Sequence, residues 1–162
     1  MYESTGELCQ FTRGAYHVSQ PPNGYIAICH TRRAFSNFAF EVLSTIAQGD
    51  CGGVIFRNDS NMRFYKLAIC QDSAYSVRKY SSDTSHITLK VGKSSAIRIG
   101  LGKPNKIAVV ASQSHMTFYV NEQQIDQEQD SSYTLGNIAL IASPGYSHVT
   151  DVAYSNAKLW RL

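Results

Sequence analysis

Apolar residues recur at every second position in most segments of this chain. Between Phe38 and Ile46 every even position except Ser44 is apolar, and residues 116–120 alternate in the same way. A period of two places alternate side chains on opposite faces of a β-strand. Clusters of Gly, Pro, Asn and Asp, such as PPNG at 21–24, mark the turns between these segments. The pattern predicts an all-β sandwich or barrel with at most a short helical turn.

Residues 51–70, CGGVIFRNDSNMRFYKLAIC, have the pattern of two strands joined by a polar turn. A turn at the DSNM sequence pairs Arg57 with Phe64 and Cys51 with Cys70. Opposed residues of a hairpin have Cβ atoms roughly 4.5–5.5 Å apart, which is close to disulfide geometry. The register therefore predicts a Cys51–Cys70 disulfide.

The chain has four cysteines, and the remaining two, Cys9 and Cys29, pair by elimination. Both lie on early predicted strands that could be neighbours. Two disulfides indicate an oxidising compartment, so we expect an extracellular or cell-surface protein. The alternative is four buried free thiols in a cytosolic protein. The wide spacing, without a CxxC pair, argues against zinc.

Length and charge exclude several classes of protein. The 162 residues show no linker or repeat, so we expect one domain over 1–162. The net charge is +3 and the basic residues are scattered, which argues against a nucleic-acid partner. No apolar run approaches the roughly 20 residues of a membrane span, so no membrane insertion is expected.

Three motifs carry a resemblance to a known family. They are the GGVIFR hairpin, the NKIAVV strand followed by FYVN, and the closing VAYSNAKLW. Residues 8–162 resemble the concanavalin A-like lectin/glucanase jelly rolls, also described as laminin G-like. The nearest branch holds fructan-binding carbohydrate-binding modules, 3-keto-disaccharide hydrolase-like domains and extracytoplasmic domains of bacterial serine/threonine kinases. The resemblance implies a jelly-roll sandwich of two antiparallel sheets, with ligands on a concave face or in its rim loops.

Alternation divides the predicted hairpin into two faces. We assign Val54, Phe56, Tyr65, Leu67 and Ile69 to the core. On the opposite face, we expect any ligand site to involve Arg57, with Lys66, Phe64, Asp59 and Asn61 as its neighbours. Arg presents fixed donors for hydroxyl or carboxylate groups, and an aromatic ring can pack on a sugar. The alternatives are a solvated sheet face with one stray Phe, or a site in the loops around residues 50, 71 and 80.

This face assignment predicts opposite outcomes for two substitutions. Phe56→Ala should cost roughly 3–5 kcal/mol of stability, as expected for a core aromatic residue. Arg57→Ala should change stability by less than about 1 kcal/mol, as expected for an exposed side chain, and should weaken binding.

The sequence carries no catalytic signature. Glycosidases need two carboxylates across the scissile bond, and the glucanases of this superfamily place them in an E-x-D-x-x-E strand. The nearest string, from Glu122 through Asp126 to Glu128, has the wrong spacing. No nucleophile motif such as G-x-S-x-G is present, so we predict no catalytic residue and no enzyme.

No cofactor or metal is predicted. Asp50, Asp59 and Asp151 lie near predicted strand ends, where several sandwiches of this superfamily bind structural calcium. The sequence shows no Asp-rich calcium loop, so calcium is unsupported.

We therefore expect a non-catalytic, lectin-like carbohydrate-binding module, bacterial and part of a larger protein with other domains. The single tryptophan, Trp160, argues against a polysaccharide platform and favours a small sugar or a chain end. One alternative is a protein-interaction or sensor domain of the same fold. Another is a disaccharide-directed hydrolase-like domain, which rests on fold kinship alone.

Overall fold

A computed structural model describes residues 8–21, 27–143 and 149–162. All regular elements in these ranges are β-strands, and all their pairings are antiparallel. No described segment forms a helix of the length and hydropathy that a membrane crossing requires. The all-β prediction is confirmed.

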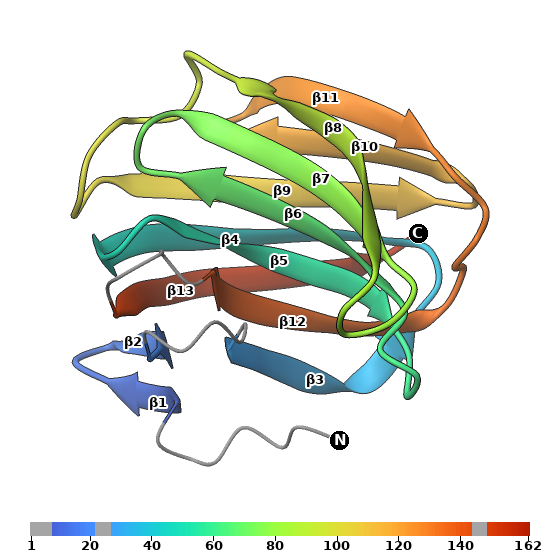
Figure 1. Cartoon of the computed structure of the whole chain (residues 1–162), viewed down its shortest axis with the longest axis horizontal. Coiled ribbons are helices and arrows are strands. Elements are labelled where there is room, and N and C mark those ends of the chain that lie inside the picture. The colour runs from blue at the N-terminus through green and yellow to red at the C-terminus, as the bar shows by residue number, and fades with distance from the viewer. Residues whose placement is uncertain (1–7, 22–26, 144–148) are drawn as a thin grey trace.

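The strands form two sheets. In spatial order, the seven-stranded sheet contains β1 (Cys9–Thr12), β2 (Ala15–Gln20), β13 (Thr150–Arg161), β4 (Phe38–Gln48), β9 (Pro104–Ser112), β10 (His115–Val120) and β11 (Gln123–Gln129). The six-stranded sheet contains β3 (Ala27–Phe35), β12 (Gly136–Ser143), β5 (Cys51–Asn58), β6 (Phe64–Cys70), β7 (Ala74–Tyr80) and β8 (His86–Lys93). Figure 1 shows the two sheets one behind the other, with the six-stranded sheet in front.

The core lies between the sheets and uses one face of each strand. Phe38, Phe56 and Phe118 bring aromatic rings together from both sheets, with centroids 6.1 and 6.3 Å from that of Phe56. All three are buried, as are the other hairpin residues assigned to the core from sequence. Alternation thus predicted the inner face correctly, because each strand turns one row of side chains toward the opposite sheet.

Both predicted disulfides are present. Cys51 and Cys70 are opposed in the β5–β6 register, with Cα atoms 4.1 Å apart. Cys9 and Cys29, with Cα atoms 6.1 Å apart, join β1 of one sheet to β3 of the other. The first disulfide links the two strands of a hairpin, and the second links the two sheets at one edge of the sandwich.

Candidate functional site

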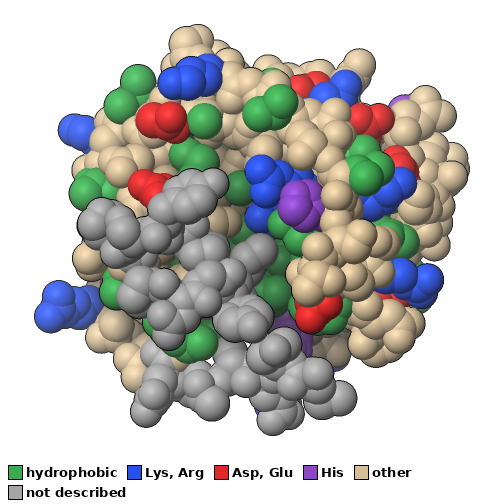
Figure 2. Space-filling model, viewed as in Figure 1, with side chains coloured by type: hydrophobic (Ala, Val, Ile, Leu, Met, Phe, Trp, Pro, Cys, Tyr) green, Lys and Arg blue, Asp and Glu red, His purple; other side chains and the backbone are tan. Residues whose placement is uncertain are grey.

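The outer face of the six-stranded sheet, which points away from the seven-stranded sheet, carries basic and aromatic side chains. The strand register places Phe64 opposite Tyr80 and Lys66 opposite Arg78, and it places His86 opposite Tyr80 on the next strand. Opposed residues share a face, so these five side chains gather on one side of β6, β7 and β8. Figure 2 shows basic and histidine side chains together near the middle of this face. We call the five residues the basic–aromatic cluster.

Three rings of this cluster form a stack across the three strands. The centroids of Phe64 and Tyr80 lie 4.5 Å apart with 18° between the ring planes, and those of Tyr80 and His86 lie 4.8 Å apart at 28°. The Nζ atom of Lys66 lies 5.3 Å from the centroid of the Tyr80 ring, which is a cation–π distance. Phe64 and Tyr80 are buried whereas His86 is exposed, so the stack is open to solvent at His86.

The two cations of the cluster form no ion pair with a carboxylate of the described residues. Lys66 is only 4% exposed. The buried Nε atom of Arg78 has no hydrogen-bond partner among the described residues. Burial lowers the pKa of Lys66; the neighbouring Tyr80 opposes this shift and the charge of Arg78 adds to it. Burial, and then the positive charges of Arg78 and Lys66, also lower the pKa of His86.

An apolar strip continues the outer face beside the cluster, on β5 and β12. Ile55 lies opposite Lys66, and Ala139 lies opposite Ile55. Both are buried, as is Ile141 further along β12. With aromatic residues of the basic–aromatic cluster they form a second apolar cluster, separate from the core between the sheets. The cations therefore lie against a surface of low polarity, where electrostatic interactions are stronger than in water.

The structure places Lys66 and Phe64 on the outer face, as predicted, and places Asp59 and Asn61 in the turn between β5 and β6. The Asp59 carboxylate accepts hydrogen bonds from Asn61 N at 2.9 Å and from Arg63 Nε at 2.7 Å. Burial alone would raise the pKa of Asp59, but the hydrogen bonds from Arg63 and Asn61 outweigh it and lower that pKa. Asp59 therefore stabilises the turn, and ligand binding by either turn residue stays a prediction.

The predicted exposure of Arg57 is wrong, because its side chain is 0% exposed. Arg57 has a φ of 52°, and β5 has one extra residue relative to β12 at this point, which interrupts the alternation. Its guanidinium donates to the backbone oxygens of Ser36 at 3.0 Å, Gln113 at 2.7 Å and Tyr133 at 3.1 Å. Burial lowers the pKa of Arg57, although the phenol of Tyr65 opposes the shift. Arg57 therefore joins three turns of the scaffold.

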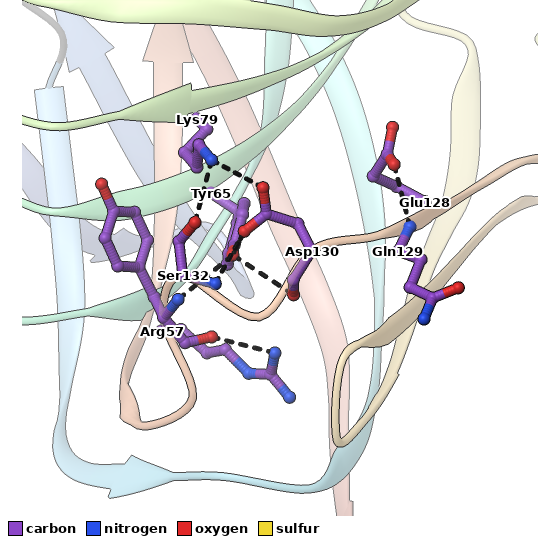
Figure 3. A network of polar contacts seen from close by, with 8 residues as sticks. Arg57, Tyr65, Lys79, Glu128, Gln129, Asp130 and Ser132 are labelled. Carbon is purple, nitrogen blue, oxygen red and sulfur yellow. Dashed lines mark hydrogen bonds and ion pairs between the residues drawn. The ribbon is translucent and has the colours of Figure 1, made fainter.

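Close to Arg57, a polar network links β6, β7 and the connection from β11 to β12 (Figure 3). The Tyr65 hydroxyl donates to Asp130 at 2.5 Å, and Lys79 Nζ donates to the same carboxylate at 2.6 Å. Burial alone would raise the pKa of Asp130, but hydrogen bonds from Lys79, Ser132 and Tyr65 hold it well below its usual range. The carboxylate is fully engaged, so this network serves the fold.

Sequence reasoning missed Arg78 and His86 as members of the candidate site, and it named Tyr80 only as part of an alternative site in the loops. The signal for Arg78 and Tyr80 lay in the alternation of AYSVRKY, which puts both on one face of the strand after Lys66. The position of His86 had no such signal. The β7–β8 register shifts between Val77 and Arg78, so the parity of β8 changes along its length.

The outer face of the seven-stranded sheet offers a second surface. A cleft of about 410 Å³ there is lined by Glu41, Leu43, Lys106, Asn156, Ala157 and Lys158. Its charges are paired: Lys158 lies 3.3 Å from Glu41, and Lys106 lies 2.6 Å from Glu122. Paired charges leave this cleft with less capacity to bind a polar ligand than the basic–aromatic cluster.

Across residues 8–21, 27–143 and 149–162, no three His, Cys, Asp or Glu side chains are grouped as metal ligands would be. Asp151, one of the three residues considered for calcium, accepts a hydrogen bond from Ser19 at 2.7 Å and lies 3.0 Å from His17 Nδ1. Its carboxylate is thus used in joining β13 to β2.

Comparison with solved structures shows the fold. The carbohydrate-binding module CBM66 from Bacillus subtilis matches with a TM-score of 0.78 and 15% identity, over 93% of this chain and 89% of that one. A putative glycosyl hydrolase from Parabacteroides distasonis matches with a TM-score of 0.69 and 13% identity, over 96% of this chain and 91% of that one. Sheep galectin-11, in complex with glycerol, matches with a TM-score of 0.57 and 10% identity, over 87% of this chain and 100% of that one. The chain has the concanavalin A-like jelly-roll fold.

No family model matches the sequence, and no curated protein matches it either. At identities of 15% or less, the structural matches establish the arrangement of strands and leave the activity open. The function must therefore be inferred from the side chains of this chain.

Proposed function

We propose that this domain is a non-catalytic carbohydrate-binding module that holds a small sugar or a chain end at the basic–aromatic cluster. The observation that carries the proposal is the combination of stacked rings with two cations that lack carboxylate partners in the described structure. Sugars bind through ring packing against an aromatic face, which here is the exposed His86 at the end of the stack, and through hydrogen bonds from fixed polar groups. The structural matches to a carbohydrate-binding module and to a galectin support the same function.

The carboxylates of the described residues support a non-catalytic role. Glycoside hydrolysis uses two carboxyl groups facing one bond. Asp126 and Glu128 are close enough to be considered, but each has an oxygen 3.8 Å from Lys90 Nζ. The Tyr75 hydroxyl also donates to Asp126 at 3.0 Å. We therefore assign these carboxylates to the contact between β11 and β8, and we infer no reaction.

The disulfides support an extracellular or cell-surface location. Within such a protein, a sugar-binding module would carry its ligand site on a rigid sheet while other domains of the parent chain supply further activities. Sheet-borne side chains are held more accurately than loop residues, which suits recognition of one sugar end.

A glycan array followed by calorimetry tests the proposal. Arg78→Leu removes charge-assisted hydrogen bonds worth about 1.5–3 kcal/mol each, so we expect the Kd of any array hit to rise about tenfold or more. Lys158→Met, in the cleft on the other sheet, is the matched loss of one positive charge and should bind like the parent. Binding lost in Lys158→Met and kept in Arg78→Leu would move the site to that cleft. Absence of any glycan hit would overturn the proposal.

A protein-interaction domain is the second candidate, and one observation favours it. Trp160 is 47% exposed and Leu162 is 63% exposed at the end of β13, far in sequence from the basic–aromatic cluster. Exposed large apolar side chains often mark protein contacts. A pull-down from culture medium that depends on Trp160 and leaves the glycan array blank would favour this function.

A further inference from the structure

We propose that the ligand of the basic–aromatic cluster is an acidic sugar, whose carboxylate or sulfate ester lies between Lys66 and Arg78. This inference rests on the proposed function and narrows it to one class of carbohydrate. It follows from how the chain distributes its charges.

The six-stranded sheet is strongly basic although the whole chain is nearly balanced. The chain has 15 Lys and Arg, 12 Asp and Glu, and a net charge of +3. None of the 12 acidic residues lies within a strand of the six-stranded sheet. The basic residues of these strands are Arg32, Arg33, Arg57, Lys66, Arg78, Lys79, Lys90 and Lys93. The sheet therefore has a local excess of positive charge that no residue within it compensates.

Three of the other six cations of this sheet lie near carboxylates from outside it. Lys79 pairs with Asp130, and Lys90 lies near Asp126 and Glu128. Even Lys93, with a side chain 69% exposed, lies 3.6 Å from an Asp carboxylate. Arg57 has no carboxylate partner in the described structure, but its guanidinium donates hydrogen bonds to three backbone oxygens. Arg32 and Arg33 also form no ion pair in the described structure, but both are exposed to water. Lys66 and the Nε atom of Arg78 are buried, so the lack of a carboxylate costs most at these two residues.

Lys66 and Arg78 are poorly placed to remain without a partner. They are opposed across β6 and β7, and like charges in opposed positions destabilise a sheet. Lys66 is 4% exposed, so water screens it little, and the buried Nε of Arg78 lacks a protein acceptor in the described structure. The turn from β5 to β6 contains Asp59, which is bonded to Arg63, and the turn from β7 to β8 contains Asp83.

An anion at this position would complete the site. A carboxylate or sulfate can accept hydrogen bonds from Arg78, neutralise Lys66, and remove the repulsion between them. The sugar ring bearing that anion would then lie near His86, the exposed end of the ring stack. Burial is the main cause of the lowered pKa of Lys66 and of His86, and the neighbouring positive charges add to it; a bound anion would offset this second contribution.

Matched pairs of glycans test this inference. The probes are oligogalacturonate with its carboxyl-reduced counterpart, sulfated dextran with unsulfated dextran, and inorganic sulfate alone, each titrated calorimetrically into the whole chain. We expect at least one acidic glycan to bind tenfold or more tightly than its neutral counterpart, and the gap to close in Arg78→Leu and Lys66→Met. Lys103→Met, a matched charge loss at an exposed turn residue, should keep the gap. Melting temperatures verify that each variant is folded.

The outcomes separate the two proposals. If neutral and acidic members of every pair bind equally, and Arg78→Leu weakens both, the sugar site stands and the acidic ligand is refuted. If inorganic sulfate binds as tightly as the best glycan, the anion site stands and the carbohydrate function is refuted. If no probe binds, or if Lys103→Met closes the gap as Arg78→Leu does, the acidic-sugar inference fails. An upward shift of the His86 pKa by NMR on adding the acidic glycan is the independent sign that the anion lies in the cluster.

Discussion

Replacing Arg57 with Ala should destabilise this protein strongly although Arg57 contacts no ligand in our assignment. Its guanidinium donates three hydrogen bonds to the backbone oxygens of Ser36, Gln113 and Tyr133, which lie outside the strands in three separate connections. Hydrogen bonds from a charged group contribute about 1.5–3 kcal/mol each. The three therefore amount to roughly 4–9 kcal/mol before the cost of burying the charge is subtracted.

The desolvation of Arg57 reduces that sum. Its lowered pKa reflects burial of the charge, and its Nε atom has no partner in the described structure. Removing a buried charged partner typically costs about 3–5 kcal/mol, and we expect Arg57→Ala to fall in this range. For a chain of this size, such a loss lowers Tm by roughly 6–20 °C, taking about 2–4 °C per kcal/mol.

Urea denaturation of two variants provides the measurement. Arg63→Ala, in the neighbouring turn, is the control, because Arg63 is an exposed Arg whose side chain pairs with Asp59 at 2.7 Å. An exposed ion pair contributes at most about 1 kcal/mol, so this variant should unfold nearly as the parent does. If Arg57→Ala also stays within about 1 kcal/mol of the parent, the guanidinium does not hold the turns together and our reasoning is wrong.

Four further predictions follow from the structure. Gly136→Ala should destabilise the protein more than an average substitution, because an added Cβ would lie 2.3 Å from the backbone carbon of Arg57; chemical denaturation measures the loss. Phe56→Ala should cost roughly 3–5 kcal/mol, since Phe56 is fully buried among three aromatic rings, and the same denaturation series would show it. Stability should fall as the pH drops below about 5, because the pKa of Asp130 is lower in the folded state than in the unfolded state; its contribution is complete above the unfolded pKa and disappears as the folded carboxylate takes up a proton. The measurement is the urea midpoint of the parent and of Asp130→Asn from pH 7 to pH 2. If the difference between the two midpoints stays constant over this range, the prediction for Asp130 is wrong. Reducing Cys51–Cys70 should lower stability by on the order of 3 kcal/mol through the loop that it closes, as seen in melting curves of a Cys51→Ala/Cys70→Ala variant, and a variant that melts like the parent would contradict it.

The sequence alone predicted the parts of this structure that depend on near neighbours in the chain. Alternation depends only on strand geometry, so it predicted which hairpin residues face the core and that Lys66 and Phe64 lie on the outer face. The Cys51–Cys70 disulfide follows from the register of one hairpin. Each prediction succeeded because the interacting residues are joined by a single short turn.

The burial of Arg57 was determined by the tertiary structure. Its left-handed backbone and its burial depend on Gly136 packing against residues 57 and 58, and on carbonyl groups of three distant turns. None of these partners is near residue 57 in the chain. A period-two pattern does not account for a bulge, so it assigned the Arg57 side chain to the wrong face.

The candidate site divides in the same way. Phe64 and Lys66 were found from one strand, whereas Arg78 and His86 join them only through the pairing of β6 with β7 and of β7 with β8, including the shift after Val77. Their unusual feature is burial without a carboxylate partner in the described structure, and this depends on where the acidic residues of the chain come to lie. Composition fixes how many charges a protein has, but only the folded chain determines which of them meet.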